Sequence, residues 1–300
     1  MMLNRRNFVQ AMGAASLAGA LPGGVHAAGP EPLPRRPIPG TDESIAIVGL
    51  GNARAFHESD MALSRQLIDV LLEHGGSYID SGWDGRTVLS TISREFDAQE
   101  QLFLGTYIEG KDLRSMRAEV QGFVDLQGGG PLDMVQIYSP EELEQRYDEF
   151  VALREEGLVR YFGVARYAKE FYPAMMNVME KGLVDFVQFN YSIMEPEAAD
   201  DILPLAQETG TAVIANRPFI NGNYFDVVRG QALPGWAADF DCHSWAQFSL
   251  KYILAHPAVT CVITETSNPK HVIDNLGAGY GRLPDADQTR QMEAVIRGLL

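Results

Sequence analysis

The sequence is poor in cysteine and in basic residues. It holds 2 Cys among 300 residues, at positions 242 and 261, and 24 Lys plus Arg against 40 Asp plus Glu. Two cysteines exclude a disulfide-rich scaffold, and the helix expected between them should keep them apart, so we expect two free thiols. The net charge of −16 argues against nucleic acid or anionic lipid as a partner, and slightly disfavours anionic substrates.

Three further patterns are missing. The His and Cys residues show no metal-ligand spacing, so we expect no metal site. Beyond residue 28, no apolar run is long enough to cross a bilayer. No Gly-x-Gly-x-x-Gly follows a candidate strand. That absence disfavours the second choice of fold, an open doubly wound sheet.

The N-terminus has the features of an export signal. Arg5 and Arg6 precede a weakly apolar, Ala/Gly-rich run that ends at Leu21, and residues 25–27 read Val-His-Ala, a small-x-small cleavage pattern. Paired arginines before such a run are similar to a twin-arginine signal. We therefore predict a signal peptide at 1–27, export to the periplasm by the twin-arginine machinery, and no membrane association afterwards. The alternatives are an ordinary cytosolic N-terminus and a retained anchor.

The rest of the chain alternates short apolar runs with amphipathic ones. Residues 28–43 are expected to be a linker, since five prolines lie between Gly29 and Pro39. From Ser44 onward we expect strands near 45–48, 78–80, 102–106, 134–137, 161–164, 186–188, 211–215 and 260–263. Helices are expected near 61–74, 86–96, 113–126, 143–156, 170–181, 196–209, 244–255 and 269–276, with a last one at 286–299.

Eight strand–helix units with apolar strands predict a closed parallel sheet covered by helices. We therefore expect residues 44–300 to form a single-domain (β/α)₈ TIM barrel with an extra C-terminal helix. The roughly 250 residues available are typical of that fold.

The stretch from Gly76 to Gly85 is the most informative site signal. A short apolar strand ends there on Asp80, directly before a glycine-containing turn. A carboxylate at the end of a buried strand is costly unless it is paired or binds something. We interpret Asp80 as a site residue. We interpret Asp84 as the N-cap of the helix that begins near Arg86, and the alternative for Asp80 is that it makes this cap.

In such a barrel the site lies at the C-terminal ends of the strands. The residues at those ends are Asn52, Phe56, Asp80, Trp83, Tyr107, Tyr138, Arg166, Tyr167, Gln188, Asn190, Asn216, Arg217 and 265–268. An aromatic-rich mouth with a few polar groups suits a small organic ligand.

Successive strand motifs resemble those of the aldo/keto reductases, and the resemblance covers Ser44 to Leu276 in order. The motifs are Gly-Ser-Tyr-Ile-Asp80, Leu-Phe-Leu-Gly-Thr106, Asp133-Met-Val-Gln-Ile, Glu156-Gly-Leu-Val-Arg-Tyr-Phe-Gly-Val164, Val184-Asp-Phe-Val-Gln-Phe-Asn-Tyr191, Val213-Ile-Ala-Asn-Arg-Pro-Phe219 and the run from Val262 to Asn275. The resemblance implies reduction of a small carbonyl compound with NAD(P)H, and it is greatest to the exported branch of that family.

The family's catalytic set of Asp, Tyr, Lys and His is degenerate in this sequence. Its Asp matches Asp80, but the Lys position holds Tyr107 and the His position holds Tyr138. The usual Tyr falls near Trp83 and Asp84. We therefore assign catalysis to Asp80, Tyr107 and Tyr138. The substrate pocket is assigned to Phe56, Trp83 and Arg166.

The resemblance also implies cofactor-binding positions, several of which differ. We assign cofactor binding to Gln188, Arg217, Thr266, Ser267, Asn268 and Asn275. Ala165-Arg166 stands at the position of the Ser-Asn pair that holds the nicotinamide carboxamide in the family. Asn216 stands at the position of the aromatic residue that stacks on the nicotinamide. Glu265 and His271 stand at the positions of the Lys and Arg that bind the 2′-phosphate in the family. A glutamate would repel a phosphate.

Two hypotheses remain. The first is a reductase whose proton donor has been rebuilt from Tyr107 or Tyr138. The second is a barrel that binds a small organic ligand without redox chemistry. Because Asp80 lacks its usual lysine, we expect its carboxylate to accept a hydrogen bond from one of these two phenols.

Overall fold

The computed structural model describes residues 32–52, 55–95 and 102–300. The chain divides into two units, residues 1–30 and 31–300. The expected signal peptide, and the first residues of the expected linker, lie outside the described residues.

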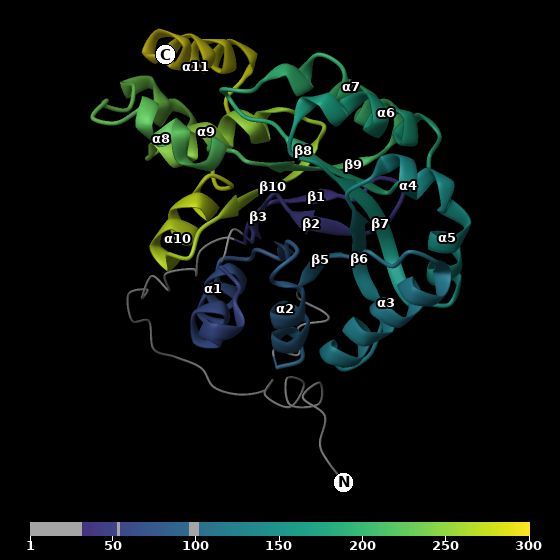
Figure 1. Ribbon diagram of the computed structural model, residues 1–300. Coiled ribbons are helices and arrows are strands. Elements are labelled where there is room, and N and C mark those ends of the chain that lie inside the picture. Colours follow the sequence, from purple (N-terminus) through teal and green to yellow (C-terminus); the bar gives the residue numbers. More distant parts are fainter. Residues whose placement is uncertain (1–31, 53–54, 96–101) are drawn as a thin grey trace, which may run out of the picture. The chain divides into compact units, whose positions relative to one another are not determined.

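The second unit is built on a closed barrel of eight parallel strands (Figure 1). The strands are β3 (Val48–Gly51), β4 (Tyr78–Asp80), β5 (Phe103–Tyr107), β6 (Leu132–Ile137), β7 (Val159–Ala165), β8 (Phe186–Asn190), β9 (Ala212–Asn216) and β10 (Val259–Glu265). Consecutive strands are neighbours, and β10 closes the ring by pairing Val262 with Val48 of β3. The expected (β/α)₈ TIM barrel is confirmed.

Helices lie around the outside of the barrel in Figure 1. They are α1 (Met61–Glu73), α2 (Arg86–Ser93), α3 (Leu113–Gln127), α4 (Pro140–Gln145), α5 (Tyr147–Glu155), α6 (Tyr172–Glu180), α7 (Ile202–Thr209), α8 (Asn223–Val227), α9 (Trp245–Ala255), α10 (Pro269–Gly277) and α11 (Ala286–Leu299). Side-chain caps mark the N-termini of several helices. Asp112 forms a capping box with Ser115 at α3, and Ser244 caps α9 through the Gln247 amide.

Two helix predictions need correction. The helix expected at 143–156 is two helices, α4 and α5, that meet at Arg146. At the same place, the Arg146 guanidinium pairs with both Glu142 and Glu149, one carboxylate from each helix. The short helix α8 was not predicted, because its five residues are too few to show a helical period.

The N-terminal linker prediction is wrong for its second half. Residues Arg35–Pro37 form β1, which pairs antiparallel with β2 (Ser44–Ala46). The expected strand at 45–48 is therefore split near Ile47, between the hairpin and the barrel. Proline is tolerated at a two-stranded edge because it lacks only the ladder donor. The Arg36 guanidinium ties the hairpin to the barrel through the carbonyl oxygens of Leu254 and His256.

Alternate residues along the strands change from apolar to polar toward the C-terminal end of the barrel. In β4, buried Tyr78 is followed two residues later by Asp80, and in β8 Phe186 is followed by Gln188. The apolar layer is Ile38, Ile45, Tyr78, Phe103, Met134, Tyr161, Phe186, Ala212, Ile214, Cys261 and Ile263. Since Ile38 and Ile45 belong to the hairpin region, the hairpin covers the N-terminal end and leaves the polar end for a site.

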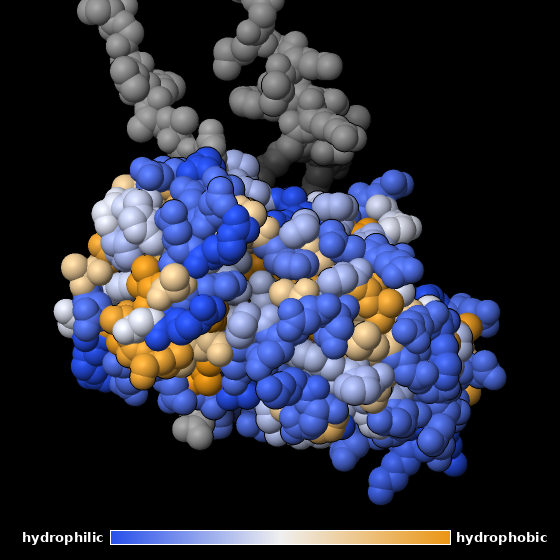
Figure 2. Space-filling view, turned by 90° about the horizontal axis from the view of Figure 1, so that it is seen from above, coloured by the Kyte–Doolittle hydropathy of each residue, from blue (hydrophilic) through white to orange (hydrophobic). Residues whose placement is uncertain are grey.

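The face of the molecule in Figure 2 is mainly hydrophilic, as expected when the apolar side chains are buried in the core, and the apolar residues on it gather in separate groups. Cys242 and Cys261 are both buried free thiols, as predicted. In the part of the chain described, no helix is both long enough and apolar enough to span a bilayer.

Candidate functional site

A cavity of about 330 Å³ opens at the C-terminal ends of the strands. We call it the mouth cavity, and its lining is Asn52, Asp80, Gly82, Trp83, Tyr107, Tyr138, Ala165, Arg166, Tyr167, Gln188, Asn216, Arg217, Asn221 and Glu265. Its size is at the lower end of the range for small-molecule sites. Seven of the predicted site residues therefore come together from six strand ends.

The Asp80 carboxylate is the hub of a buried hydrogen-bond network. Tyr107 Oη donates to Asp80 Oδ2 at 3.1 Å, and Gln136 Nε2 donates to the same oxygen at 3.2 Å. The backbone N–H of Gly82 donates to Oδ1 at 2.6 Å. The expected bond from a phenol is thus present, and it comes from Tyr107. The cap expected from Asp84, and the alternative cap from Asp80, are both wrong, because α2 begins after Gly85 without a side-chain cap.

Burial decides the ionisation of this network. Desolvation raises the pKa of Asp80 above its ordinary value, although its hydrogen bonds, with that from the Gly82 amide the largest, oppose the change. The pKa of Tyr107 is raised well above 10, first by burial and then by the negative charge of Asp80. Tyr107 therefore keeps its proton and serves as a donor to the carboxylate. Its oxygen also accepts a bond from Gln188 Nε2 at 3.2 Å.

Tyr138 occupies a different environment beside this network. It follows the last residue of β6, and its ring stacks on Tyr107 with 4.9 Å between centroids and 22° between planes. The side chain is 40% exposed, against 3% for Tyr107. Burial and then Asp80 raise the pKa of Tyr138, while the guanidinium groups of Arg86 and Arg166 lower it. Of the two stacked phenols, Tyr138 is thus the one that a ligand in the mouth can reach.

The opposite wall carries buried polar atoms without partners among the described residues. They are Gln188 Oε1, Asn216 Oδ1 and the Nε atoms of Arg166 and Arg217. Other atoms of these side chains are fixed: Asn216 Nδ2 donates to the Arg166 carbonyl at 2.9 Å, and Arg217 Nη1 to the Tyr167 carbonyl at 3.0 Å. A buried polar atom without a partner is costly. These atoms therefore offer acceptors and donors to a polar ligand.

Two further cavities continue past β9 and β10. One, of about 460 Å³, is lined by Arg217, Phe219, Phe225 and Glu265 among others. The next, of about 370 Å³, is bordered by Thr266, His271 and Asn275. Glu265 lies against all three cavities. Its side chain reaches solvent, yet partial burial and then Asp80 raise its pKa, while Arg217 lowers it.

The remaining predicted residues lie elsewhere. Phe56 is 1% exposed and packs in the hydrophobic core rather than along a described cavity, so its assignment to the substrate pocket is corrected. Phe56 lies five residues after the end of β3 at Gly51, where strand alternation no longer fixes the direction of a side chain. Asn268 caps α10 by accepting from the Lys270 amide, and Ser267 is exposed.

Gln136 is a site residue that the sequence analysis missed. It is fully buried and bonds to Asp80, and it lies two residues before Tyr138. Side chains alternate along β6, so Gln136 and Tyr138 lie on one face. The spacing of two residues in the sequence could therefore have predicted that Gln136 faces the site. Among the residues described, no group of three or more His, Cys, Asp or Glu is arranged to hold a metal ion.

Comparison with known proteins gives consistent matches. Residues 47–297 match the model described as Aldo/keto reductase family. A curated protein of Bacillus subtilis (strain 168), the uncharacterized oxidoreductase YqkF, is 22% identical over 305 residues, covering 87% of this chain and 95% of that protein.

Solved structures share the fold at low identity. The holo form of aldo-keto reductase AKR11C1 from Bacillus halodurans superposes with a TM-score of 0.71 at 17% identity, covering 88% of this chain and 96% of that one. An aldo/keto reductase from Klebsiella pneumoniae, solved in complex with NADP and acetate, gives 0.69 at 17% identity, covering 86% and 94%. At such identity these structures establish the fold and leave the chemistry to the site residues.

Proposed function

Because this chain belongs to the aldo/keto reductase family, we propose that it reduces a small carbonyl compound in the mouth cavity, with NADH or NADPH as the reductant. One observation carries the proposal. An accessible phenol, Tyr138, stacks on a buried phenol, Tyr107, that is hydrogen-bonded to the family's Asp at position 80. The Klebsiella pneumoniae relative, solved with NADP, supports a nicotinamide as the cofactor.

The unpaired polar atoms of the mouth fit a nicotinamide carboxamide. That group offers two N–H donors and one carbonyl acceptor. Gln188 Oε1 and Asn216 Oδ1 are unpaired acceptors, and Arg166 Nε is an unpaired donor. The cavities past Arg217, toward Thr266 and Asn275, have room for the rest of a dinucleotide. When bound, the reduced nicotinamide supplies a hydride to the carbonyl carbon.

Tyr138 is the proposed proton donor to the carbonyl oxygen. Tyr107 is unsuited because it is buried and already donates to Asp80. Tyr138 borders the cavity and is exposed enough to regain a proton from solvent. A phenol has an ordinary pKa of about 10, so a nearby cation is needed to make it a useful acid. Burial and then Asp80 raise the pKa of Tyr138, and the guanidinium groups of Arg86 and Arg166 oppose that rise. We assign to these two cations the role of the missing lysine.

The test is equilibrium binding followed by turnover. Purified protein is titrated with NADH and NADPH while tryptophan fluorescence is recorded, and cofactor oxidation is then measured with a panel of small aldehydes and ketones. We expect cofactor binding, and turnover that falls at least a hundredfold in Tyr138→Phe. Tyr224→Phe is the matched control, because that buried tyrosine bonds to the Trp245 carbonyl outside the mouth cavity. Turnover equal in Tyr138→Phe and wild type contradicts the assignment.

A second candidate function, ligand binding without redox chemistry, is favoured by one observation. The lining of the mouth cavity includes no lysine in the described part of the chain, and the carboxylate of Glu265 borders the groove expected to hold the dinucleotide. Absence of NADH and NADPH binding to folded protein selects this candidate, since hydride transfer requires a bound nicotinamide.

We also propose that the protein acts in the periplasm after export by the twin-arginine machinery. Arg5 and Arg6, followed by the weakly apolar run, support this proposal. The two free thiols are compatible with transport of an already folded protein, because folding needs no disulfide formed after export.

A further inference from the structure

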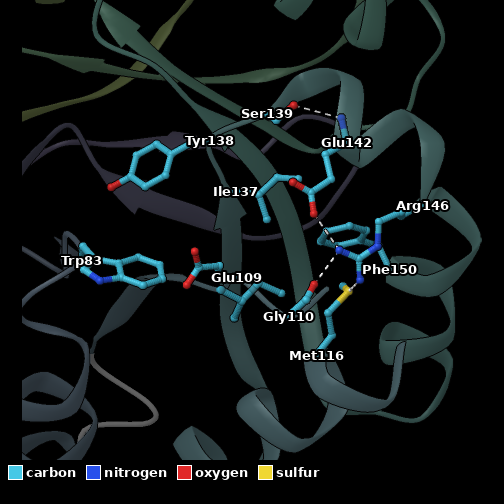
Figure 3. Close-up of a pocket in the computed structure, with 11 residues that line it drawn as sticks. Trp83, Glu109, Gly110, Met116, Ile137, Tyr138, Ser139, Glu142, Arg146 and Phe150 are labelled. Atoms are coloured by element: carbon cyan, nitrogen blue, oxygen red, sulfur yellow. Dashed lines mark hydrogen bonds and ion pairs between the residues drawn. The ribbon is translucent and has the colours of Figure 1, made fainter. Parts of the chain in front are cut away.

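A second cavity, of about 270 Å³, lies beside the mouth cavity and shares two of its residues, Trp83 and Tyr138 (Figure 3). We call it the side cavity. Its other lining residues are Ile108, Glu109, Gly110, Met116, Ile137, Ser139, Glu142, Arg146 and Phe150. A ligand whose carbonyl lies against Tyr138 can therefore extend a second group past the tyrosine ring into this space.

The walls of the side cavity are aromatic at its entrance and apolar at its base. Trp83 and Tyr138 are 36% and 40% exposed, whereas Ile108, Met116 and Phe150 are buried. One face of the Trp83 ring is covered by the guanidinium of Arg86, whose carbon lies 3.4 Å from the ring centroid, and the charge of that guanidinium is paired with Glu119 at 2.9 Å. Electron-rich ring faces next to a cavity attract cations as well as apolar groups.

Glu109 adds an uncompensated negative charge at this entrance. Glu142, also on the wall, is neutralised by Arg146 at 2.7 Å. For the Glu109 carboxylate, by contrast, neither a hydrogen bond nor an ion pair is found within the described residues. In Figure 3 this carboxylate points toward Trp83, away from Arg146.

The backbone that carries Glu109 is tightly fixed. Its N–H and that of Gly110 donate to Glu119 Oε2 at 2.9 and 3.0 Å, and Arg146 Nη1 donates to the Gly110 carbonyl at 2.5 Å. Arg86 bonds to both the Tyr107 carbonyl and Glu119. The loop therefore presents a free carboxylate from a rigid frame, which lowers the entropic cost of binding.

We propose that the side cavity binds an organic ammonium group, so that the substrate is a carbonyl compound with a cationic amine arm. The assignment of the carbonyl rests on the proposed function, whereas the cation site rests only on Trp83, Tyr138 and Glu109. Two rings and a carboxylate attract an ammonium ion, repel an anion, and give a neutral group of the same shape only apolar contact.

Binding of choline, compared with its neutral isostere 3,3-dimethyl-1-butanol, tests the cation site without any turnover. Both are titrated against the purified full chain by tryptophan fluorescence at 0.15 M salt, which suppresses long-range attraction to the acidic protein. We expect choline to bind about tenfold more tightly, and Glu109→Gln to reduce that preference to near unity. Glu208→Gln, an exposed glutamate on α7 outside the cavity, is the matched control and should keep the preference.

Turnover with a second isosteric pair links the site to the substrate. The compounds are 4-(trimethylammonio)benzaldehyde and 4-tert-butylbenzaldehyde. Because the para ammonium also activates the carbonyl toward hydride in any enzyme, the quantity compared is the ratio of their kcat/KM values, which should be about tenfold higher in wild type than in Glu109→Gln. Equal binding of choline and its isostere, or a preference that Glu109→Gln leaves intact, overturns the cation site. If choline binds with the expected preference but neither NADH nor NADPH binds and both aldehydes are inert, the cation site stands and the reductase proposal fails.

Discussion

The phenol of Tyr107 donates a hydrogen bond to the carboxylate of Asp80, with 3.1 Å between the two oxygens. Both side chains are 3% exposed, so the bond forms away from solvent. In the resemblance to aldo/keto reductases, position 107 is that of a lysine. The donor found here is a neutral phenol, where the resemblance implies a cation. The side-chain amide of Gln136 and the backbone N–H of Gly82 also donate to the carboxylate.

Replacing Tyr107 by phenylalanine is expected to destabilise the fold by about 1–3 kcal/mol, because a buried carboxylate loses one of its donors. The ring and its packing against Tyr138 are kept, so the change reports on the hydroxyl. Urea unfolding at neutral pH measures the effect. Tyr167→Phe, at a side chain that is 57% exposed, should change the free energy of unfolding by less than about 0.5 kcal/mol.

The pH dependence of stability should contain a contribution from Asp80. Burial raises its pKa in the folded state above the ordinary 3.8. The folded protein therefore binds the proton more tightly than the unfolded chain does. This contribution to stability is fully present below the unfolded value, and is lost as the pH rises through the folded pKa. Wild type should consequently lose stability relative to Asp80→Asn as the pH rises above about 4.

The measurement is urea unfolding of both proteins at several pH values, with the difference between them plotted. Subtracting the variant removes titrating groups that do not interact with Asp80. The influence of Asp80 on Glu265, whose pKa it raises after burial, stays in the difference and belongs to the Asp80 contribution. Asp69→Asn, at an exposed position of α1, should run parallel to wild type. A constant difference between wild type and Asp80→Asn across the range shows that Asp80 keeps an ordinary pKa in the fold.

The barrel itself followed from the sequence because each apolar strand is short and is followed by an amphipathic helix. A contact of Asp80 with either Tyr107 or Tyr138 was also expected. Pairing of β4 with β5 places Asp80 opposite Gly105, two residues before Tyr107, so that Tyr107 lies on the same face as Gly105. The hairpin at residues 35–46 was not expected. Its prolines favour an extended backbone, which is as typical of a linker as of a strand. The hairpin is held in place by hydrogen bonds from Arg36 to carbonyl oxygens more than 200 residues away in the sequence. No local pattern encodes such a contact.

Side-chain direction in loops limited the prediction of the site. Phe56 lies beyond a strand end, where no alternation fixes which way a residue points, and it packs in the core. Glu109 was not singled out, because a charged loop residue is ordinary in sequence. Only the frame around it, made by Arg86, Glu119 and Arg146, distinguishes Glu109 from other surface carboxylates.

The proposed export signal gives a prediction that is independent of the barrel. Changing Arg5 and Arg6 together to lysine should leave the protein in the cytoplasm with its N-terminal segment attached, because the twin-arginine route reads that pair. Cell fractionation and the mass of the recovered chain measure the outcome. Changing Arg35 to lysine, in the β1 hairpin, is the control and should leave export intact. Normal periplasmic arrival of the double variant refutes the twin-arginine assignment.

The cofactor preference should differ from that of a reductase that binds the 2′-phosphate of NADPH through basic side chains. Glu265 and His271 occupy the positions where the family resemblance expects positive charge, and Glu265 borders the groove beyond β10. An added 2′-phosphate would meet a carboxylate and lose charge-assisted hydrogen bonds, so NADH should bind at least as tightly as NADPH. Titration of both cofactors tests this. Glu265→Gln should tighten NADPH more than NADH. If wild type clearly prefers NADPH, another cation such as Lys270 must reach the phosphate, and the role given to Glu265 is wrong.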